Sequence, residues 1–281
     1  MKFESIHFRR WPALLAAVLV AAGCGGNGDG ASTAATTPDN SASVAGSGNY
    51  TVTGTITGFG SVIIDGKRFD DAAAAVAVDQ GASAPSNGTL SDLRLGMSVD
   101  ARIEDGQLRD VVVRAKLDGP IGTIDLAGGS FTVYGQTVKV ITTGATPTIF
   151  DGVSDLAGLA PGNRVEVHGT VDANRALNAT RVVRKANGEG APGVRIGGVV
   201  TQLDGPAHTF RFNDLTIDYT NATITPEGKL PANGNLVLAV GDTPPAAGRF
   251  VARTLRIVSA PEGEAFVIGG RIASFTSIAD F

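Results

Sequence analysis

The sequence predicts an all-β protein built of small, closed β-barrels in tandem, and three observations support this fold class. The chain of 281 residues contains 38 glycines and is 43% hydrophobic, so it can form a core but must turn often. Its apolar residues alternate with polar ones at the period of two that is typical of β-strands. A Gly-X-Ile or Gly-X-Val motif recurs about every 70 residues, which indicates internal repeats.

Residues 1–23 have the features of an export signal and do not belong to the fold. Lys2, Arg9 and Arg10 supply the positive charges that precede the apolar run of residues 13–22. This run is too short to span a bilayer, which needs about 20 residues. We therefore expect the protein to leave the cytoplasm.

The signal ends in Ala21–Cys24, which resembles the lipobox of bacterial lipoproteins. The resemblance implies that Cys24 is acylated and becomes the N-terminus, and that the acyl chains attach the protein to a membrane. Because Gly25 follows in place of Asp, it also implies sorting to the outer membrane of the bacterial envelope. Ordinary secretion is the alternative. With a single cysteine in the chain, no internal disulfide can form.

The remaining chain divides by composition and by repeats. Small and polar residues dominate the segment after Cys24, which predicts a flexible tether. We predict a signal peptide at 1–23, a tether at 24–49, barrel repeats at 50–117, 118–190 and 191–259, and the start of a fourth repeat at 260–281.

The first repeat opens with a strand over Tyr50–Thr57, where β-branched residues alternate. A second strand, Ser61–Ile64, is followed by Asp65 and Gly66, a pair typical of a type I′ hairpin turn, and the chain returns over Lys67–Phe69.

An alanine-rich turn then leads into a strand that contains Val76 and Val78. The stretch Leu90–Asp105 predicts a short turn, a glycine at position 96 and a long alternating strand. An alternating strand that carries an arginine, Val111–Ala115, closes the repeat.

The later repeats follow the same plan. The opening motif recurs at Gly54, Gly122, Gly198 and Gly270. We expect hairpin turns after Phe131–Tyr134 and Phe210–Phe212. A glycine precedes the long strand of each repeat, at Gly96, Gly162 and Gly234. The closing strands of the second and third repeats, each with an arginine, are expected at Ala179–Val183 and Ala252–Val258. Val153–Gly169 is the second copy of the turn and long strand. Closure into a barrel would remove the exposed edges of such small sheets.

Three stretches, residues 53–69, 90–103 and 154–182, resemble a bacterial family of exported repeat proteins known as domain of unknown function 5666. The resemblance covers nearly everything from Tyr50 onward. It implies five-stranded barrels similar to oligonucleotide/oligosaccharide-binding (OB) folds, carried on lipoproteins. It brings no activity and no functional residue with it.

The formal net charge is −4, without any basic run, which argues against nucleic acid as a partner. We expect a non-enzymatic binding or scaffold module that needs no cofactor, with a glycan or an envelope protein as its partner. The alternative is a carbohydrate-active or metal-dependent hydrolase that uses Glu166 and His168, which alternate with Val165 and Val167 on one strand. The simpler interpretation of the two polar side chains is that they face solvent.

The residues most suited to a ligand surface are apolar and follow each opening motif: Phe59, Leu203 and Phe275, with Ala127 in the second repeat. They fall in the first inter-strand loop, which borders the ligand face in this class of barrel. The simpler interpretation is that these residues plug the end of each barrel. No catalytic or metal-ligating residue is predicted.

Overall fold

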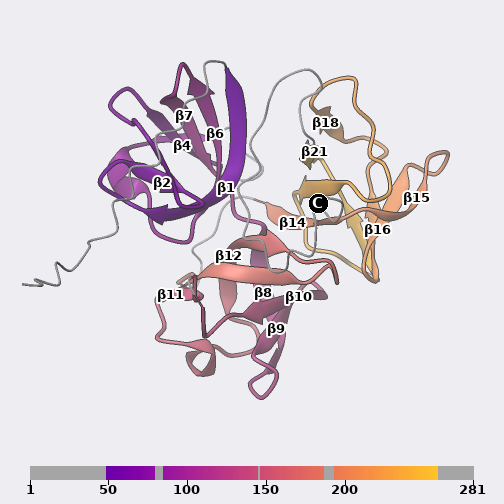
Figure 1. Ribbon diagram of the computed structural model, residues 1–281. Helices are drawn as coiled ribbons and strands as arrows, with labels where there is room; N and C mark the ends of the chain where they lie inside the picture. Colours follow the sequence, from indigo (N-terminus) through magenta and orange to yellow (C-terminus); the bar gives the residue numbers. More distant parts are fainter. Residues whose placement is uncertain (1–48, 80–84, 145, 187–192, 259–281) are drawn as a thin grey trace, which may run out of the picture. The chain divides into compact units, whose positions relative to one another are not determined.

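The computed structural model describes residues 49–79, 85–144, 146–186 and 193–258. This part contains 21 β-strands and two short 3-10 helices, and it has no α-helix (Figure 1). The predicted all-β class is confirmed. None of the helices described is long and apolar enough to cross a membrane. Cys24, the tether, Phe275 and the expected fourth repeat lie outside the described residues.

The strands of the three repeats occupy five matching positions. The opening strands are β1 (Tyr50–Gly58), β8 (Leu117–Asp125) and β14 (Val194–Val199), the last continued by β15 (Thr201–Asp204). The hairpin strands are β2 (Val62–Ile64) with β3 (Lys67–Phe69), β9 (Ser130–Val133) with β10 (Gln136–Val140), and β16 (Thr209–Phe212) with β17 (Leu215–Asp218). The fourth strands are β6 (Ser98–Glu104), β12 (Arg164–Val171) and β19 (Leu236–Gly241).

The closing strands are β7 (Gln107–Val113), β13 (Leu177–Arg184) and β20 (Arg249–Val251), the last continued by β21 (Thr254–Val258). Each closing strand also pairs, in parallel, with a side strand: β4 (Ala75–Val78), β11 (Ile149–Asp151) and β18 (Thr223–Thr225). The first side strand forms a hairpin with β5 (Ser86–Gly88). The 3-10 helices are η1 (Leu90–Asp92) and η2 (Leu156–Gly158), which precede the first two fourth strands.

The order of strand pairing is circular and the same in each repeat. In the second repeat β8 pairs with β9, β9 with β10, β10 in parallel with β13, β13 with β12, and β12 again with β8. In the third repeat β17 meets β20 in parallel, and β19 pairs with both β21 and β14. In the first repeat the parallel contact is one bridge, Asp70 to Gln107. The repeats therefore share one plan of pairing.

The turn chemistry agrees with the predictions. Asp65 (φ 48°) and Gly66 (φ 80°) both have positive φ, as a type I′ hairpin turn requires. The glycines before the fourth strands, Gly96, Gly162 and Gly234, have φ of 81°, 84° and 89°, where a Cβ would be strained. Their N–H groups donate to the opening-strand carbonyls of Ile56, Ile121 and Val200, at 2.8, 2.8 and 2.9 Å.

These hydrogen bonds correct one element of the repeat alignment. They make Ile121 the counterpart of Ile56 and Val200, so Gly119, not Gly122, matches Gly54 and Gly198. The reason is steric, because each of the three glycines leaves room for a side chain of the following hairpin. A Cβ on Gly119 would lie 2.1 Å from the ring of Tyr134, and one on Gly198 would lie 2.7 Å from the ring of Phe212.

Two apolar cores hold the repeats. One belongs to the first repeat and contains Val52, Ile64, Phe69, Ile103 and Leu108 among others. The other runs through the second and third repeats without interruption, from Phe131 and Val167 to Phe210 and Ile257. The opening strands β8 and β14 also pair with each other, Leu117 opposite Ile196. The second and third repeats are thus joined by core and sheet, whereas the first repeat makes polar contacts to both.

Candidate functional site

A groove of about 440 Å³ lies on the outer face of the first repeat's sheet. Its floor is formed by outward-facing residues of neighbouring strands, because side chains of the same face recur at every second position. Across the strands these residues stand opposite one another, Thr51 beside Arg102, Arg102 beside Asp110, and Asp110 beside Ala75. A second row runs from Asp100 through Val112 and Ala77 to Asn87. Small side chains in the floor make the hollow.

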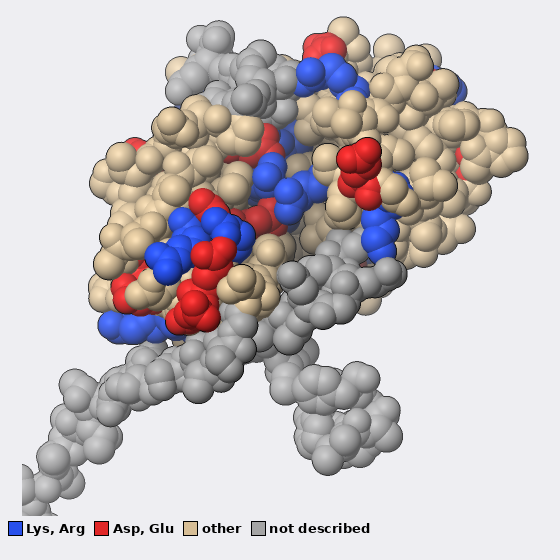
Figure 2. Space-filling view, turned by 90° about the horizontal axis from the view of Figure 1, so that it is seen from above, with Lys and Arg blue, Asp and Glu red and all other residues tan. Residues whose placement is uncertain are grey.

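Charged side chains line the groove in pairs. Arg102 contacts Asp110 and Glu104, and all three are partly exposed to solvent. At the other side Arg114 Nε donates to Asp100 at 2.6 Å, and Arg256 of β21 donates to the same carboxylate at 2.8 Å. Figure 2 shows acidic and basic side chains next to one another on the face that it presents. Such a surface offers both donors and acceptors to a polar ligand.

The side of the groove that carries Asp100 and Arg114 meets a polar junction of the first and third repeats. Asp79, which follows β4, contacts Arg114 and accepts a hydrogen bond from Arg195 of β14 at 2.7 Å. Arg195 is 3% exposed, so this is a buried ion pair between the first and third repeats. Asp100 also accepts a hydrogen bond from the Thr53 hydroxyl at 2.7 Å.

His168 lies in the contact between the first and second repeats and is fully buried. Its Nδ1 accepts a hydrogen bond from the Ser98 N–H at 3.1 Å, and its Nε2 is 3.0 Å from Glu166 Oε1. The expectation that His168 faces solvent is therefore wrong: Val165 and Val167 face the core, but the first repeat covers the other face of β12 at this point. Since Nδ1 is occupied by a backbone donor, His168 is not available to a substrate.

The environment of Glu166 is that of a structural carboxylate. Burial alone would raise its pKa, but hydrogen bonds and charge from His168 and from Lys185, whose Nζ is 2.8 Å away, hold the pKa well below its usual range. Asp118 on β8 is nearly inaccessible, and burial raises its pKa although Arg164 donates to it at 2.9 Å. Among the residues that the structure describes, no three His, Cys, Asp or Glu side chains are placed to hold a metal ion.

The predicted ligand residues are not brought together. Phe59 follows β1 and is 47% exposed, whereas Leu203 on β15 is partly buried against the core of the second and third repeats. In the second repeat Ala127 is exposed, next to Leu126, which is 62% exposed. The groove and junction residues were not among the predicted site residues. One signal in the sequence points to two of them, because each closing strand carries an arginine and Arg114 and Arg256 are of this kind.

Comparison with known proteins gives one family. The profile described as Domain of unknown function (DUF5666) matches residues 118–183 and again residues 197–253, the second and third repeats. Residues 50–113 lie outside both matches, yet their strands pair in the same order. No curated protein matches the sequence. The chain therefore carries two copies of the domain of unknown function 5666, preceded by a repeat with the same strand pairing.

Proposed function

We propose that this protein is a non-enzymatic binding module of the bacterial envelope that takes a polar, uncharged or acidic ligand of the glycan class in the groove of its first repeat. The observation that carries this proposal is the groove itself, with a volume of about 440 Å³ and a lining of Arg102, Asp110, Asn87 and Thr51 over a floor of alanines. Alternating donors and acceptors suit the hydroxyl groups of a sugar. Among the described residues that line this groove there is no histidine, cysteine or serine.

We further propose that each repeat is a small OB-like barrel. The circular pairing order supports this interpretation, because each of the five strands of the second repeat pairs with two others of the five, as in a closed barrel. OB folds bind oligosaccharides on the face of strands 2 and 3 and on the adjoining loops, which in the first repeat are β2 and β3. The groove lies on β1, β4, β6 and β7 instead, so the proposed site differs from the usual ligand face of this class of barrel. The pairing of β8 with β14 would make the second and third repeats one rigid part of such a scaffold.

Membrane attachment through Cys24 completes the proposal. A Cys24→Ser variant is expected to leave the outer-membrane fraction, because the acyl chains would be its only strong attachment. If this variant still fractionates with the outer membrane, the lipid anchor is wrong.

The binding proposal is tested with a chain that lacks residues 1–24 and a panel of envelope glycans, measured by calorimetry. An Ala77→Trp substitution fills the groove without touching the core, and we expect it to abolish binding. Ala73→Trp, at an exposed position of the same repeat that does not line the groove, is the matched control and should bind as the unchanged chain does. Turnover of a bound glycan, or equal binding by both variants, would contradict the proposal.

A further inference from the structure

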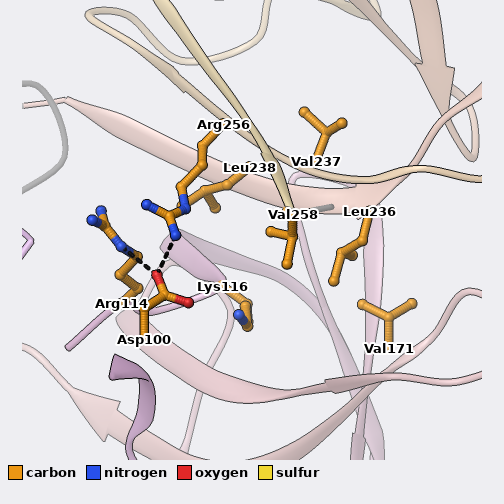
Figure 3. A pocket seen from close by; sticks show the side chains of 10 residues that line it. Asp100, Arg114, Lys116, Val171, Leu236, Val237, Leu238, Arg256 and Val258 are labelled. Carbon is orange, nitrogen blue, oxygen red and sulfur yellow. Dashed lines mark hydrogen bonds and ion pairs between the residues drawn. The ribbon is translucent and has the colours of Figure 1, made fainter. Parts of the chain in front are cut away.

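A second, much smaller cavity lies where the three repeats meet. Its volume is about 10 Å³, and its lining comes from all three repeats: Asp100 and Arg114 from the first, Lys116 and Val171 from the link and the second, and Leu238, Arg256 and Val258 from the third. It shares Asp100, Arg114 and Arg256 with the groove. Figure 3 shows Arg114 and Arg256 reaching the same carboxylate of Asp100 from two directions, with Lys116 beside them.

Within the part of the chain that the structure describes, the charges at this cavity and next to it do not balance. Four cationic side chains (Arg114, Lys116, Arg195 and Arg256) surround two carboxylates, Asp79 and Asp100. These groups leave an excess of two positive charges. The neighbouring ion pair of Arg164 and Asp118 adds one charge of each sign and does not change this excess. The excess is local, because the chain as a whole carries a formal charge of −4.

Several donors at the cavity, or next to it in the case of Arg195, also lack acceptors among the described residues. Within the described residues, the Lys116 ammonium makes no hydrogen bond and no ion pair, although it is close enough to Asp100 to feel its charge. The Nε atoms of Arg195 and Arg256 are buried and have no partner. A buried donor without an acceptor is costly, and more so when it carries charge. Burial lowers the pKa of Lys116, and three neighbouring arginines lower it further.

We propose that this cavity is the binding site of an oxyanion, a carboxylate, sulfate or phosphate group that places one oxygen between Lys116, Arg114 and Arg256. The volume suits a single oxygen atom, since about 10–15 Å³ of this kind admits one water molecule. The anion neutralises the excess charge and accepts from the unpaired Lys116 ammonium. Because its ligands come from different repeats, it also fastens the first repeat to the third.

The oxyanion has two sources, and they share one chemistry. It is either a free inorganic anion or the acidic group of a glycan whose remaining sugars lie in the adjoining groove. The assignment of the anion to a glycan rests on the proposed function, whereas the assignment to a free inorganic anion does not.

Thermal unfolding of the chain that lacks residues 1–24 tests the site, with inorganic sulfate as the probe and sodium chloride at equal ionic strength as the control for screening. A ligand that binds only the folded state raises Tm with its concentration. We expect sulfate to raise Tm more than chloride does, and Lys116→Met to weaken the sulfate dependence at least about tenfold, the effect of losing one charge-assisted hydrogen bond. Lys67→Met, on β3, is the matched control and should keep the dependence.

The quantity compared is the rise of Tm with sulfate concentration and not the starting Tm, because Lys116→Met removes a cation that burial disfavours and can itself stabilise the fold. Equal effects of sulfate and chloride on the unchanged chain, or an undiminished sulfate dependence in Lys116→Met, would overturn the site. In a second arm, a hexuronic acid oligomer is compared with a neutral one of the same length. Preference for the acidic oligomer, lost in Lys116→Met, assigns the anion to a glycan, whereas a response to sulfate alone assigns it to a free ion and leaves the site intact.

Discussion

Replacement of Arg195 by methionine tests how strongly the first repeat is fastened to the third. Methionine keeps the aliphatic stem that packs in the junction and removes the guanidinium. Arg195 Nη2 donates to both Oδ1 and the backbone oxygen of Asp79, at 2.7 and 2.8 Å, and the arginine side chain is 4% exposed. The substitution therefore removes two hydrogen bonds and one partner of a buried carboxylate.

Breaking a buried ion pair typically costs 3–5 kcal/mol, whereas an exposed pair is worth about 0–1 kcal/mol. Asp79 keeps its contact with Arg114, and the unpartnered Nε of Arg195 disappears with the side chain, so we expect the lower end, about 3 kcal/mol. The assay is urea unfolding followed by circular dichroism. Arg102→Met is the control, because its partners are half exposed, and should cost less than about 1 kcal/mol.

A double-mutant cycle with Asp79→Asn separates the pair from the rest of the site. If Arg195→Met costs no more than Arg102→Met, or if the cycle shows no coupling between positions 79 and 195, the buried pair does not hold the repeats together and the reasoning fails.

Three further predictions concern the glycines, pH and the exposed loop. Gly96→Ala should destabilise the fold more than Gly162→Ala does in urea unfolding. Both glycines have positive φ, which costs an alanine about 1–2 kcal/mol. A Cβ at position 96 would in addition lie 2.5 Å from the Thr180 carbonyl oxygen, whereas the space at position 162 is open. Burial alone would raise the pKa of Asp218, but hydrogen bonds from Thr220 and Arg249 lower it to about 2. The stabilisation from Asp218 should therefore be present above its ordinary pKa and be lost as the pH falls towards 2, and in acid titrations followed by circular dichroism Asp218→Asn should lose less stability over that range. Phe59→Ser should change the free energy of unfolding by less than about 0.5 kcal/mol, because Phe59 is exposed. Phe131→Ala, in the core, should lower it by about 3–5 kcal/mol. If the two substitutions cost the same, Phe59 belongs to the core.

The repeated fold could be predicted because its signals are local. The hairpin at Asp65 and Gly66 and the positive-φ glycines at 96, 162 and 234 each depend on a few neighbouring residues. The second opening motif was misplaced by three residues, because Gly122-Thr123-Ile124 copies the letters of Gly54-Thr55-Ile56 while the structural counterpart is interrupted by Pro120.

The candidate site could not be predicted in the same way, because long-range contacts form it. Asp79 and Arg195 are 116 residues apart in the chain, and Ser98 and His168 are 70 apart. Alternation along β12 shows that His168 and Val167 face opposite sides, but it does not reveal that the first repeat covers the side of His168. Alternation in the sequence indicates which residues of the first repeat's sheet face outward. It does not show that these residues form a groove, because the groove depends on the register between the strands.

Amide hydrogen exchange at Ser98 and Gly169 tests most directly that the repeats form one structure through buried polar contacts. The Ser98 N–H donates to His168 Nδ1, and the Gly169 N–H donates to Ser98 Oγ at 3.0 Å, so each amide is protected by the other repeat and not by its own sheet. We predict exchange as slow as that of the core amides, through unfolding of the whole unit. Fast exchange at these two positions, with the strands of each repeat still protected, would show that the first repeat moves independently and would contradict the account.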